Sequence, residues 1–371
     1  MKRLGLVLLF ISVSVSLCSA RGVYPSKKAF WATSWEIVTP LDIVEVVRHA
    51  YTYNYDIIFA EIRYRGDALY IPNRKNQEYP NFEPRSPLLS EQEPDFDPLD
   101  YLLKLAHLFN IEVYGWFTTF VVTSNILDNL PASHVYHRHP EWITCHKNGE
   151  PMTPPCYEGV FLDPGIPEVW EYTCNVIMDV VSNYDLDGVV LDYVRYPDST
   201  FGYNPLALER YQSEVEAGLS ANDFTLWRQH QVSQFVKMAG PRIKSVDSTL
   251  AFVVTAFPES QKANDKYGQD WKGWLSYPEL DTVYLMIYTT SDFLIEKILK
   301  ENIQDVPVNK IGVSLRAWDE KGLYTAENIV AQTALCQKHS INQMAYFSFN
   351  GMRQNNYFED MDSIMFFNRY K

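Results

Sequence analysis

The sequence has few basic residues and only one long hydrophobic run, and both shortages exclude a class of protein. Its 32 lysine and arginine residues stand against 46 aspartate and glutamate residues, for a net charge of −14 at pH 7. A nucleic-acid-binding protein needs a basic surface, so this balance argues against that class. After residue 20, no segment is long and apolar enough to span a bilayer.

Several motifs that identify common enzymes are also missing. There is no G-x-S-x-G elbow and no phosphate-binding loop, and no glycine-rich turn follows the first predicted strand. The tract His134-x-x-His137-x-His139 resembles a metal cluster, but its spacing fits neither a zinc-binding helix nor a zinc finger. We expect a solvated loop there, with no metal and no organic cofactor. A metal-dependent hydrolase stays open as an alternative, and it would require these histidines to converge with an acid.

The single long apolar run lies at the start of the chain. Lys2 and Arg3 precede an apolar stretch over residues 4–17, and Ala20 follows shortly after. A basic start, a short apolar stretch and small residues are typical of a secretory signal peptide, which we place at residues 1–20. The alternative is a lipoprotein cut before Cys18, although Leu17 fits poorly in front of a lipidated cysteine. Either reading predicts an exported protein, periplasmic or extracellular, and the second adds a lipid anchor.

Four cysteines remain after this segment. Cys145 and Cys156 flank a loop rich in proline and glycine, and in an exported protein they could form a disulfide or stay as free thiols. Cys174 and Cys336 lie in helical patterns, which predicts that they are buried.

The rest of the chain alternates between strand and helix patterns. Apolar runs predict strands at residues 30–35, 55–63, 113–122, 189–191, 250–257, 282–288, 310–315 and 343–349. Helical spacing predicts helices at residues 41–54, 99–110, 168–184, 205–219, 224–245, 270–277, 293–302 and 326–339. Eight such units indicate one α/β domain over residues 21–371, a closed (β/α)8 TIM barrel with long loops at the carboxyl ends of its strands. An open doubly wound sheet is the alternative.

In such a barrel, binding sites form where strands end, so the polar residues at those ends matter most. The buried run Val189-Val190-Leu191 leads into Asp192, the last inward position of its strand, and Arg195 lies in the loop beyond. In the second strand, alternation places Glu61, Arg63 and Arg65 on one face, with Glu61 and Arg63 pointing into the barrel. An ion pair between Glu61 and Arg63 would be the structural alternative to a catalytic role for Glu61.

The strand ends together supply the groups that glycoside hydrolysis needs. That reaction uses two carboxyl groups, about 5 to 9.5 Å apart, on either side of the scissile bond. Asp192 is the candidate nucleophile or stabilising carboxylate, and Glu259 or Glu61 is the candidate acid. The arginines would bind a carboxylate on the sugar. Aromatic rings that could contact sugars are Trp116, Tyr193, Tyr196, Tyr288 and Trp318.

Four stretches together resemble the glycosyl hydrolase-like 10 family of exported bacterial (β/α)8 proteins. They are RYRGDALY at 63–70, LDPGIPEV at 162–169, DGVVLDYVRYP at 187–197 and LMIY at 285–288. The resemblance implies a hydrolase of a bacterial envelope polysaccharide, as characterised relatives cleave peptidoglycan strands stripped of their peptides. The lactyl carboxylates of such strands would suit Arg63, Arg65 and Arg195.

The chain departs from the family at one informative position. The family often has two adjacent acids at the end of the fourth strand, whereas here Tyr193 follows Asp192. This departure motivates the alternative of a catalytically inactive barrel that binds envelope glycan.

Overall fold

The computed structural model describes residue 25 and residues 27–125, 130–154 and 158–369. The predicted signal peptide and Cys156 lie outside the described residues, so the export signal and the Cys145–Cys156 pairing stay predictions. Eight parallel strands close into a barrel in sequence order, from β1 next to β2 around to β8 next to β1. The strands are β1 (Lys27–Ala32), β2 (Ile57–Arg63), β3 (Glu112–Thr118), β4 (Gly188–Asp192), β5 (Ala251–Ala256), β6 (Thr282–Ile287), β7 (Ile311–Arg316) and β8 (Gln343–Phe347). The predicted (β/α)8 barrel is confirmed.

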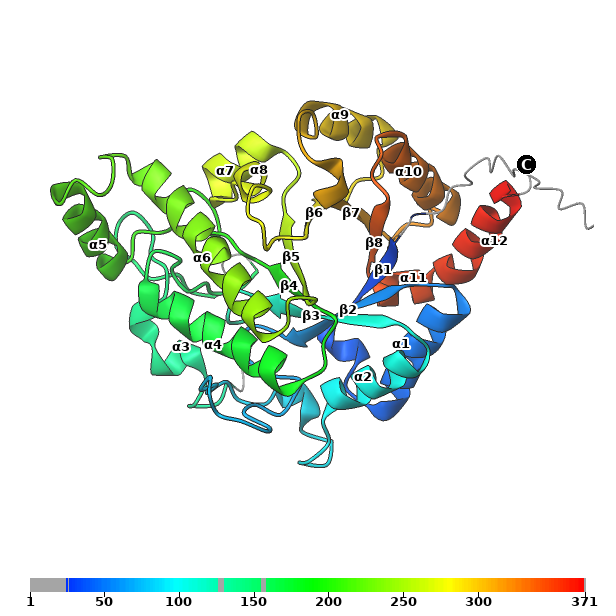
Figure 1. Ribbon diagram of the computed structural model, residues 1–371, viewed down its shortest axis with the longest axis horizontal. Coiled ribbons are helices and arrows are strands. Elements are labelled where there is room, and N and C mark those ends of the chain that lie inside the picture. Colours follow the sequence, from blue (N-terminus) through cyan, green and yellow to red (C-terminus); the bar gives the residue numbers. More distant parts are fainter. Residues whose placement is uncertain (1–24, 26, 126–129, 155–157, 370–371) are drawn as a thin grey trace, which may run out of the picture.

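Helices surround the barrel in a ring (Figure 1). They are α1 (Pro40–Thr52), α2 (Pro98–Leu108), α3 (Val135–Arg138), α4 (Pro167–Asn183), α5 (Pro205–Glu216), α6 (Phe224–Val246), α7 (Ser260–Tyr267), α8 (Trp271–Trp274), α9 (Asp292–Asn302), α10 (Ala326–Lys338), α11 (Phe349–Gln354) and α12 (Tyr357–Arg369). The starts of α1, α2 and α5 follow one rule. Thr39, Asp97 and Asn204 each accept a hydrogen bond from a backbone N–H of the first turn, and a proline follows each cap.

The apolar side chains form two layers, as strand alternation requires. One layer fills the barrel interior and consists mainly of rings, with Trp31, Phe59, Tyr114, Trp116 and Tyr284 among its members. The other lies between the strands and the helices. Within the inner layer the Trp31 indole N–H, on β1, donates to the Ser314 hydroxyl, on β7, over 2.9 Å, so this buried donor is satisfied inside the barrel.

The structure differs from the sequence predictions in a few elements. Helix α7 was not predicted, because its sequence SQKANDKY has no apolar stripe and Ala263 is its only buried residue. The two C-terminal helices α11 and α12 were also missed, and β3 ends at Thr118 instead of residue 122.

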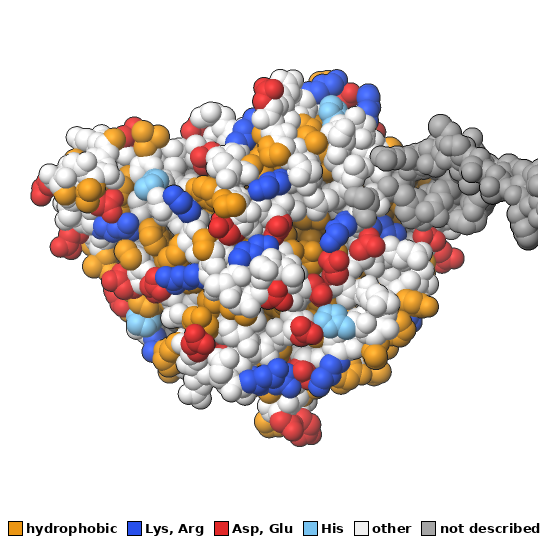
Figure 2. Space-filling model, viewed as in Figure 1, with side chains coloured by type: hydrophobic (Ala, Val, Ile, Leu, Met, Phe, Trp, Pro, Cys, Tyr) orange, Lys and Arg blue, Asp and Glu red, His pale blue; other side chains and the backbone are white. Residues whose placement is uncertain are grey.

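Acidic and basic side chains are interspersed over the face shown in Figure 2. No helix among the described residues is long and apolar enough to cross a membrane.

Gly312 offers a test of the packing inside the barrel. A Cβ atom at this position would lie 2.6 Å from the Tyr284 ring, which is closer than packed atoms allow. We therefore expect Gly312→Ala to lower the free energy of unfolding by about 1 to 3 kcal/mol, measured by urea denaturation. In the double variant with Tyr284→Leu, part of the lost free energy of unfolding should be regained, because the smaller side chain leaves room for the added Cβ atom. Equal stability of Gly312→Ala and the wild type would contradict this packing.

Candidate active site

A cavity of about 500 Å³ opens at the carboxyl ends of the strands. Eight of the residues predicted as site residues line it, from five strands, β2 to β6, and the loops that follow them: Glu61, Arg65, Trp116, Asp192, Tyr193, Arg195, Glu259 and Tyr288. The remaining three, Arg63, Tyr196 and Trp318, do not line it. The alternation of strands and helices therefore brings most of the candidates together.

Asp192 is the last residue of β4 and is buried beneath the cavity. Its Oδ1 accepts hydrogen bonds from the Tyr193 backbone N–H, over 2.8 Å, and from the Thr255 hydroxyl on β5. Burial raises the pKa of the Asp192 carboxyl, while these two hydrogen bonds and the charge of Arg195 oppose the rise. Tyr193 has a φ of 55°, a left-handed conformation that is strained for a bulky residue. The chain thus turns sharply just after the carboxyl group.

Glu61 is the second buried carboxyl group of the cavity. Its Oε2 accepts two hydrogen bonds of 3.0 Å, from the backbone N–H and from the hydroxyl of Ser34, just after β1. Burial raises the pKa of Glu61 to about 7, against the opposing effects of Ser34 and Arg65, and the charge of Asp192 adds to the rise. The Glu61 carboxyl therefore exchanges its proton near neutral pH, and a general acid needs a pKa close to the working pH.

The strand register fixes how the two carboxyls are arranged. Glu61 pairs with Trp116 on one edge of β3, and Asp192 pairs with Thr118 on the other edge. Asp192 therefore lies one inward position nearer the mouth than Glu61. Because only β3 separates β2 from β4, their backbones are about 10 Å apart, and inward side chains approach each other from there. This spacing suits two carboxyls that flank one glycosidic bond.

Arg65 is a cation at the cavity, and its charge opposes the rise in the pKa of Glu61. It follows β2 in a left-handed conformation, with a φ of 59°. Its guanidinium group lies 4.8 Å from the centre of the Tyr64 ring, and its Nη1 donates to the Thr123 carbonyl over 3.4 Å. No carboxylate within the described ranges forms an ion pair with it. It is therefore available to an anionic group in the cavity.

Arg195 has a different environment. Four aromatic rings surround its guanidinium carbon at 4.8 to 5.4 Å: Phe161, Tyr193, Phe257 and Tyr267. Its Nη2 forms an ion pair of 2.7 Å with Oε2 of Glu158, which also lines the cavity. Sequence reasoning missed Glu158, because it lies in a long loop with no periodic pattern. The hydroxyls of Ser34 and Thr255 were also missed, since neutral strand residues give no signal of a site.

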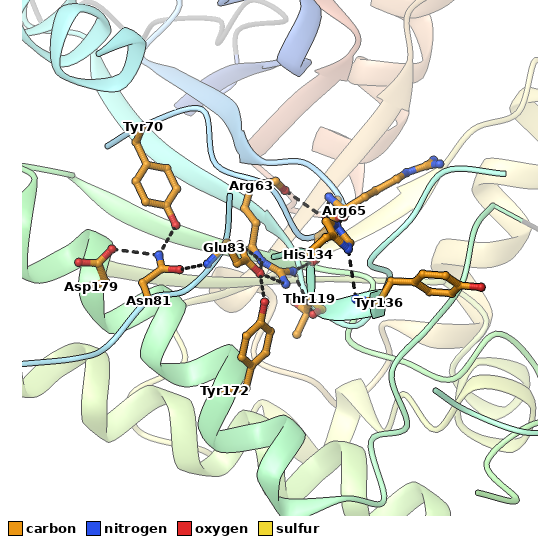
Figure 3. A network of polar contacts seen from close by, with 11 residues as sticks. Arg63, Arg65, Tyr70, Asn81, Glu83, Thr119, His134, Tyr136, Tyr172 and Asp179 are labelled. Carbon is orange, nitrogen blue, oxygen red and sulfur yellow. Dashed lines mark hydrogen bonds and ion pairs between the residues drawn. The ribbon is translucent and has the colours of Figure 1, made fainter. Parts of the chain in front are cut away.

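Arg63 does not point into the barrel, and the predicted face that it shares with Glu61 is wrong. The pairing of β2 with β3 shifts register between these two residues, so the regular alternation ends there. The Arg63 guanidinium is fully buried and pairs with Glu83, with an Nη2 to Oε1 distance of 2.5 Å. Its Nη1 donates to the backbone carbonyls of Thr118 and Thr119 at the end of β3. Arg63 therefore joins β2, β3 and the loop that carries Glu83 (Figure 3).

The same network continues into helix α4. Oε1 of Glu83 accepts a hydrogen bond of 2.7 Å from the Tyr172 hydroxyl. Nearby, the Asn81 amide donates to the Tyr70 hydroxyl and to the Asp179 carboxylate, over 2.8 and 2.9 Å. Figure 3 shows these side chains converging from the insertion and from α4. The proline-rich insertion after β2 is thus fixed to the helix layer by buried polar contacts.

Tyr196 and Trp318 also lie away from the cavity wall. Tyr196 is fully buried, and the Arg228 guanidinium lies 4.2 Å from its ring centre, so it belongs to the core. Trp318 is partly exposed and packs edge-on against Tyr288, with 5.6 Å between ring centres. Trp318 therefore extends the aromatic surface of the cavity wall outward from Tyr288.

The histidine tract is only partly a solvated loop. His134 is fully buried and caps α3, where its Nδ1 accepts from the Tyr136 N–H and its Nε2 donates to the Arg65 carbonyl, each over 3.1 Å. His139 stacks on Trp142 with 3.7 Å between ring centres. Across the described part of the chain, no three His, Cys, Asp or Glu side chains are grouped to hold a metal ion. Both ring nitrogens of His134 are used by the backbone, which leaves neither for a metal.

Fold and site together define a class of protein. Two buried carboxyls below a cavity with aromatic rings, at the carboxyl ends of a (β/α)8 barrel, are typical of glycoside hydrolases. The chain belongs to the glycosyl hydrolase-like 10 family, whose family model matches residues 28–309. Membership of this family supports the class predicted from the sequence.

Curated relatives carry related names. Glycosyl hydrolase DigH of Escherichia coli (strain K12) is 30% identical over 203 residues, which cover 51% of this chain and 42% of DigH. Glycosyl hydrolase YngK of Bacillus subtilis (strain 168) is 26% identical over 219 residues, which cover 54% of this chain and 41% of YngK. The matched region thus spans less than half of the length of either relative.

Solved structures share the fold. The glycoside hydrolase domain of PgaB (BpsB) from Bordetella bronchiseptica superposes with a TM-score of 0.68 at 13% identity, covering 92% of this chain and 99% of that domain. Alpha-L-fucosidase isoenzyme 2 from Paenibacillus thiaminolyticus gives a TM-score of 0.63 at 13% identity, covering 92% of this chain and 48% of that chain. At these identities the likeness extends to the fold alone.

The different environments of Arg63 and Arg65 predict losses of stability of different size for the same substitution. Arg63→Met would leave Glu83 buried without its partner, so we expect the free energy of unfolding to fall by about 3 to 5 kcal/mol. Arg65→Met, the matched control, breaks no ion pair with any residue that the structure describes and should cost less than about 1 kcal/mol. Urea denaturation of both variants measures the difference. Similar losses in the two would show that the buried pair does not stabilise the fold.

Proposed function

We propose that this protein is a glycoside hydrolase that cleaves a bacterial envelope polysaccharide by carboxylate acid/base chemistry. The substrate we propose is the glycan strand of peptidoglycan after removal of its peptides. The observation that carries the proposal is a pair of buried carboxyls, Glu61 and Asp192, which line one cavity and have different surroundings. Membership of the glycosyl hydrolase-like 10 family supports it.

The two carboxyls would divide the chemistry between them. Glu61, protonated near neutral pH, would give its proton to the leaving glycosidic oxygen as the bond to the anomeric carbon breaks. Asp192, in its ionised form, would attack or stabilise the anomeric carbon from the cavity floor. Water would then attack that carbon, releasing Asp192 where a bond had formed, and its proton would return to Glu61. The hydrogen bonds to Asp192 both fall on Oδ1, so Oδ2 is the oxygen available to the substrate.

Glu259 is the weaker candidate for the acid. It lies just after β5 as the cap of α7, its side chain is 43% exposed, and Lys262 approaches it at 3.7 Å. A general acid requires a partly apolar surround that favours the protonated form, and Glu61 has that surround. We therefore assign the acid to Glu61.

The arginines support a substrate with an acidic substituent. Arg63 is used by Glu83 and Arg195 is paired with Glu158, whereas Arg65 has no carboxylate partner among the described residues. A lactyl carboxylate on the sugar would provide that partner through a charge-assisted hydrogen bond. Trp116, Tyr193 and Tyr288 would contact the sugar rings. Such a substrate lies outside the cytoplasmic membrane, in agreement with the export predicted from residues 1–20.

The second candidate function is a glycan-binding barrel without activity. It is favoured by Tyr193, which stands where the family often has a second acid. Against it, Glu61, Glu158 and Glu259 line the same cavity as Asp192. The cavity therefore has acids beyond the one that Tyr193 replaces. This supply of carboxyls supports an enzyme over a binding protein.

Substitution of the carboxyls tests the assignment directly. With peptide-free glycan strands as substrate, Asp192→Asn and Glu61→Gln should each lower kcat by about 10² to 10⁴-fold, because each removes a group that acts in the transition state. Glu259→Gln should cost less than about tenfold. Mass spectrometry of the released products gives the rates and the bond that is cut. If Glu259→Gln abolished activity while Glu61→Gln kept it, the acid would be Glu259. Glycan binding without cleavage by the wild type would favour the binding protein.

The pKa of Glu61 sets a pH dependence for the reaction. The acid must be protonated, so kcat/KM should fall as the pH rises through about 7. It should also fall at low pH, where Asp192 takes up a proton. Glu61→Gln should remove the alkaline fall, and it should keep most of the wild-type rate on a dinitrophenyl glycoside, whose leaving group needs no proton. An unchanged alkaline fall in Glu61→Gln would contradict the assignment.

A further inference from the structure

The cavity has two chemically different sides. In a closed barrel of eight strands, β2 and β6 lie opposite each other. The side above β2 to β4 has the charged groups Glu61, Arg65 and Asp192. The side above β5 and β6 is mainly apolar. We name this side the apolar wall, and its members are Phe257, Pro258, Met286, Ile287, Leu294 and Ile298.

Helix α9 contributes two residues to the apolar wall. Leu294 and Ile298 are four positions apart, so they lie on one face of the helix and reach the cavity together. Ile298 is buried, whereas Leu294 is 38% exposed and lies where a bound sugar could cover it. The Ser291 hydroxyl accepts a hydrogen bond of 3.3 Å from the Leu294 N–H, which fixes the first turn of the helix. Phe293 is 77% exposed but does not line the cavity.

An aliphatic surface is a poor partner for an unsubstituted sugar. Each sugar hydroxyl that loses water against Leu294 or Ile298 would lose a hydrogen bond without replacement. Among the described residues on this side, the polar side chains that line the cavity are those of Glu259, Tyr288 and Thr289. A methyl group, by contrast, gains free energy when it leaves water for such a surface. The wall therefore suits a sugar substituent that ends in a methyl group.

We propose that the apolar wall binds the methyl group of a 2-acetamido substituent on the sugar. Leu294 would determine the specificity for sugars that carry this substituent. This inference rests on the proposed function, since it assumes that a sugar occupies the cavity. It adds which part of the sugar faces α9, and therefore how the ring is turned above Asp192. The acetamido group would lie above β5 and β6, with the charged side left for the scissile bond and for acidic substituents.

A matched pair of ligands tests the proposal. Chito-oligosaccharides and cello-oligosaccharides share the β-1,4 linkage and differ at C2, where one has an acetamido group and the other a hydroxyl. Asp192→Asn, which should bind without cleavage, would be titrated with the hexamer of each by isothermal calorimetry. We expect about tenfold tighter binding of the chito-hexamer, the usual worth of one methyl group in a fitted apolar pocket.

Two further variants identify the residue. Leu294→Asn, in the Asp192→Asn background, should lose about tenfold in affinity for the chito-hexamer and leave the affinity for the cello-hexamer unchanged. Phe293→Asn is the matched control, since it removes a neighbouring exposed side chain outside the cavity and should change neither affinity. Thermal unfolding of each variant shows that the fold is intact.

Several outcomes would overturn the inference. Equal affinity for the two hexamers, binding of neither, or an equal loss of both in Leu294→Asn would show that the wall does not recognise the acyl group. Hydrolysis of stripped glycan strands by the wild type is measured separately. Cleavage without any preference at C2 would refute the inference and leave the proposed function standing. A preference for the chito-hexamer without cleavage of any glycan would support the inference and refute the proposed function.

Discussion

The loss of water around carboxyl groups at the mouth of the barrel is the constraint on which the site depends. Closing eight parallel strands brings their carboxyl ends to one rim, and any inward acid there is surrounded by rings and neighbouring strands. For Glu61 that burial raises the pKa to about 7, with the Ser34 hydrogen bonds limiting the rise. For Asp192 the hydrogen bonds from Thr255 and Tyr193 oppose the effect of burial. Two similar side chains thereby acquire properties that suit opposite roles in one reaction.

The strands and the inward positions of both carboxyls could be predicted from the sequence, because they depend on local periodicity. The apolar runs predict the strands, and the inward position of Asp192 follows from the buried residues before it. In β2, the alternation that puts Glu61 inward and Ala60 toward the helices also holds. The fate of Arg63 could not be predicted, because the register shift depends on how β3 pairs with β2. Glu158 was missed because only tertiary contacts bring its loop over the cavity.

The three arginines at the rim show how identical side chains are separated by their partners. From the sequence, Arg63, Arg65 and Arg195 had one role, because each is a cation near a strand end. In the structure one is neutralised in the core by Glu83, and a second is enclosed by rings and paired with Glu158. Arg65 lines the cavity and forms no ion pair with an acid among the described residues. Which arginine meets a ligand is decided by where the acids fold, and acids distant in sequence are the hardest part to predict.

The loops after β2 and β3 hold each other. Arg63 binds the carbonyls of Thr118 and Thr119, and His134 from the second loop donates to the carbonyl of Arg65 in the first. Gly66 allows this close approach, since a Cβ atom there would lie 2.8 Å from the His134 ring. The two loops therefore form a single structural unit on the barrel. A designer who moved either loop alone onto a related scaffold would lose the hydrogen bonds from Arg63 to the Thr118 and Thr119 carbonyls and from His134 to the Arg65 carbonyl, so these two loops can be transplanted only as a pair.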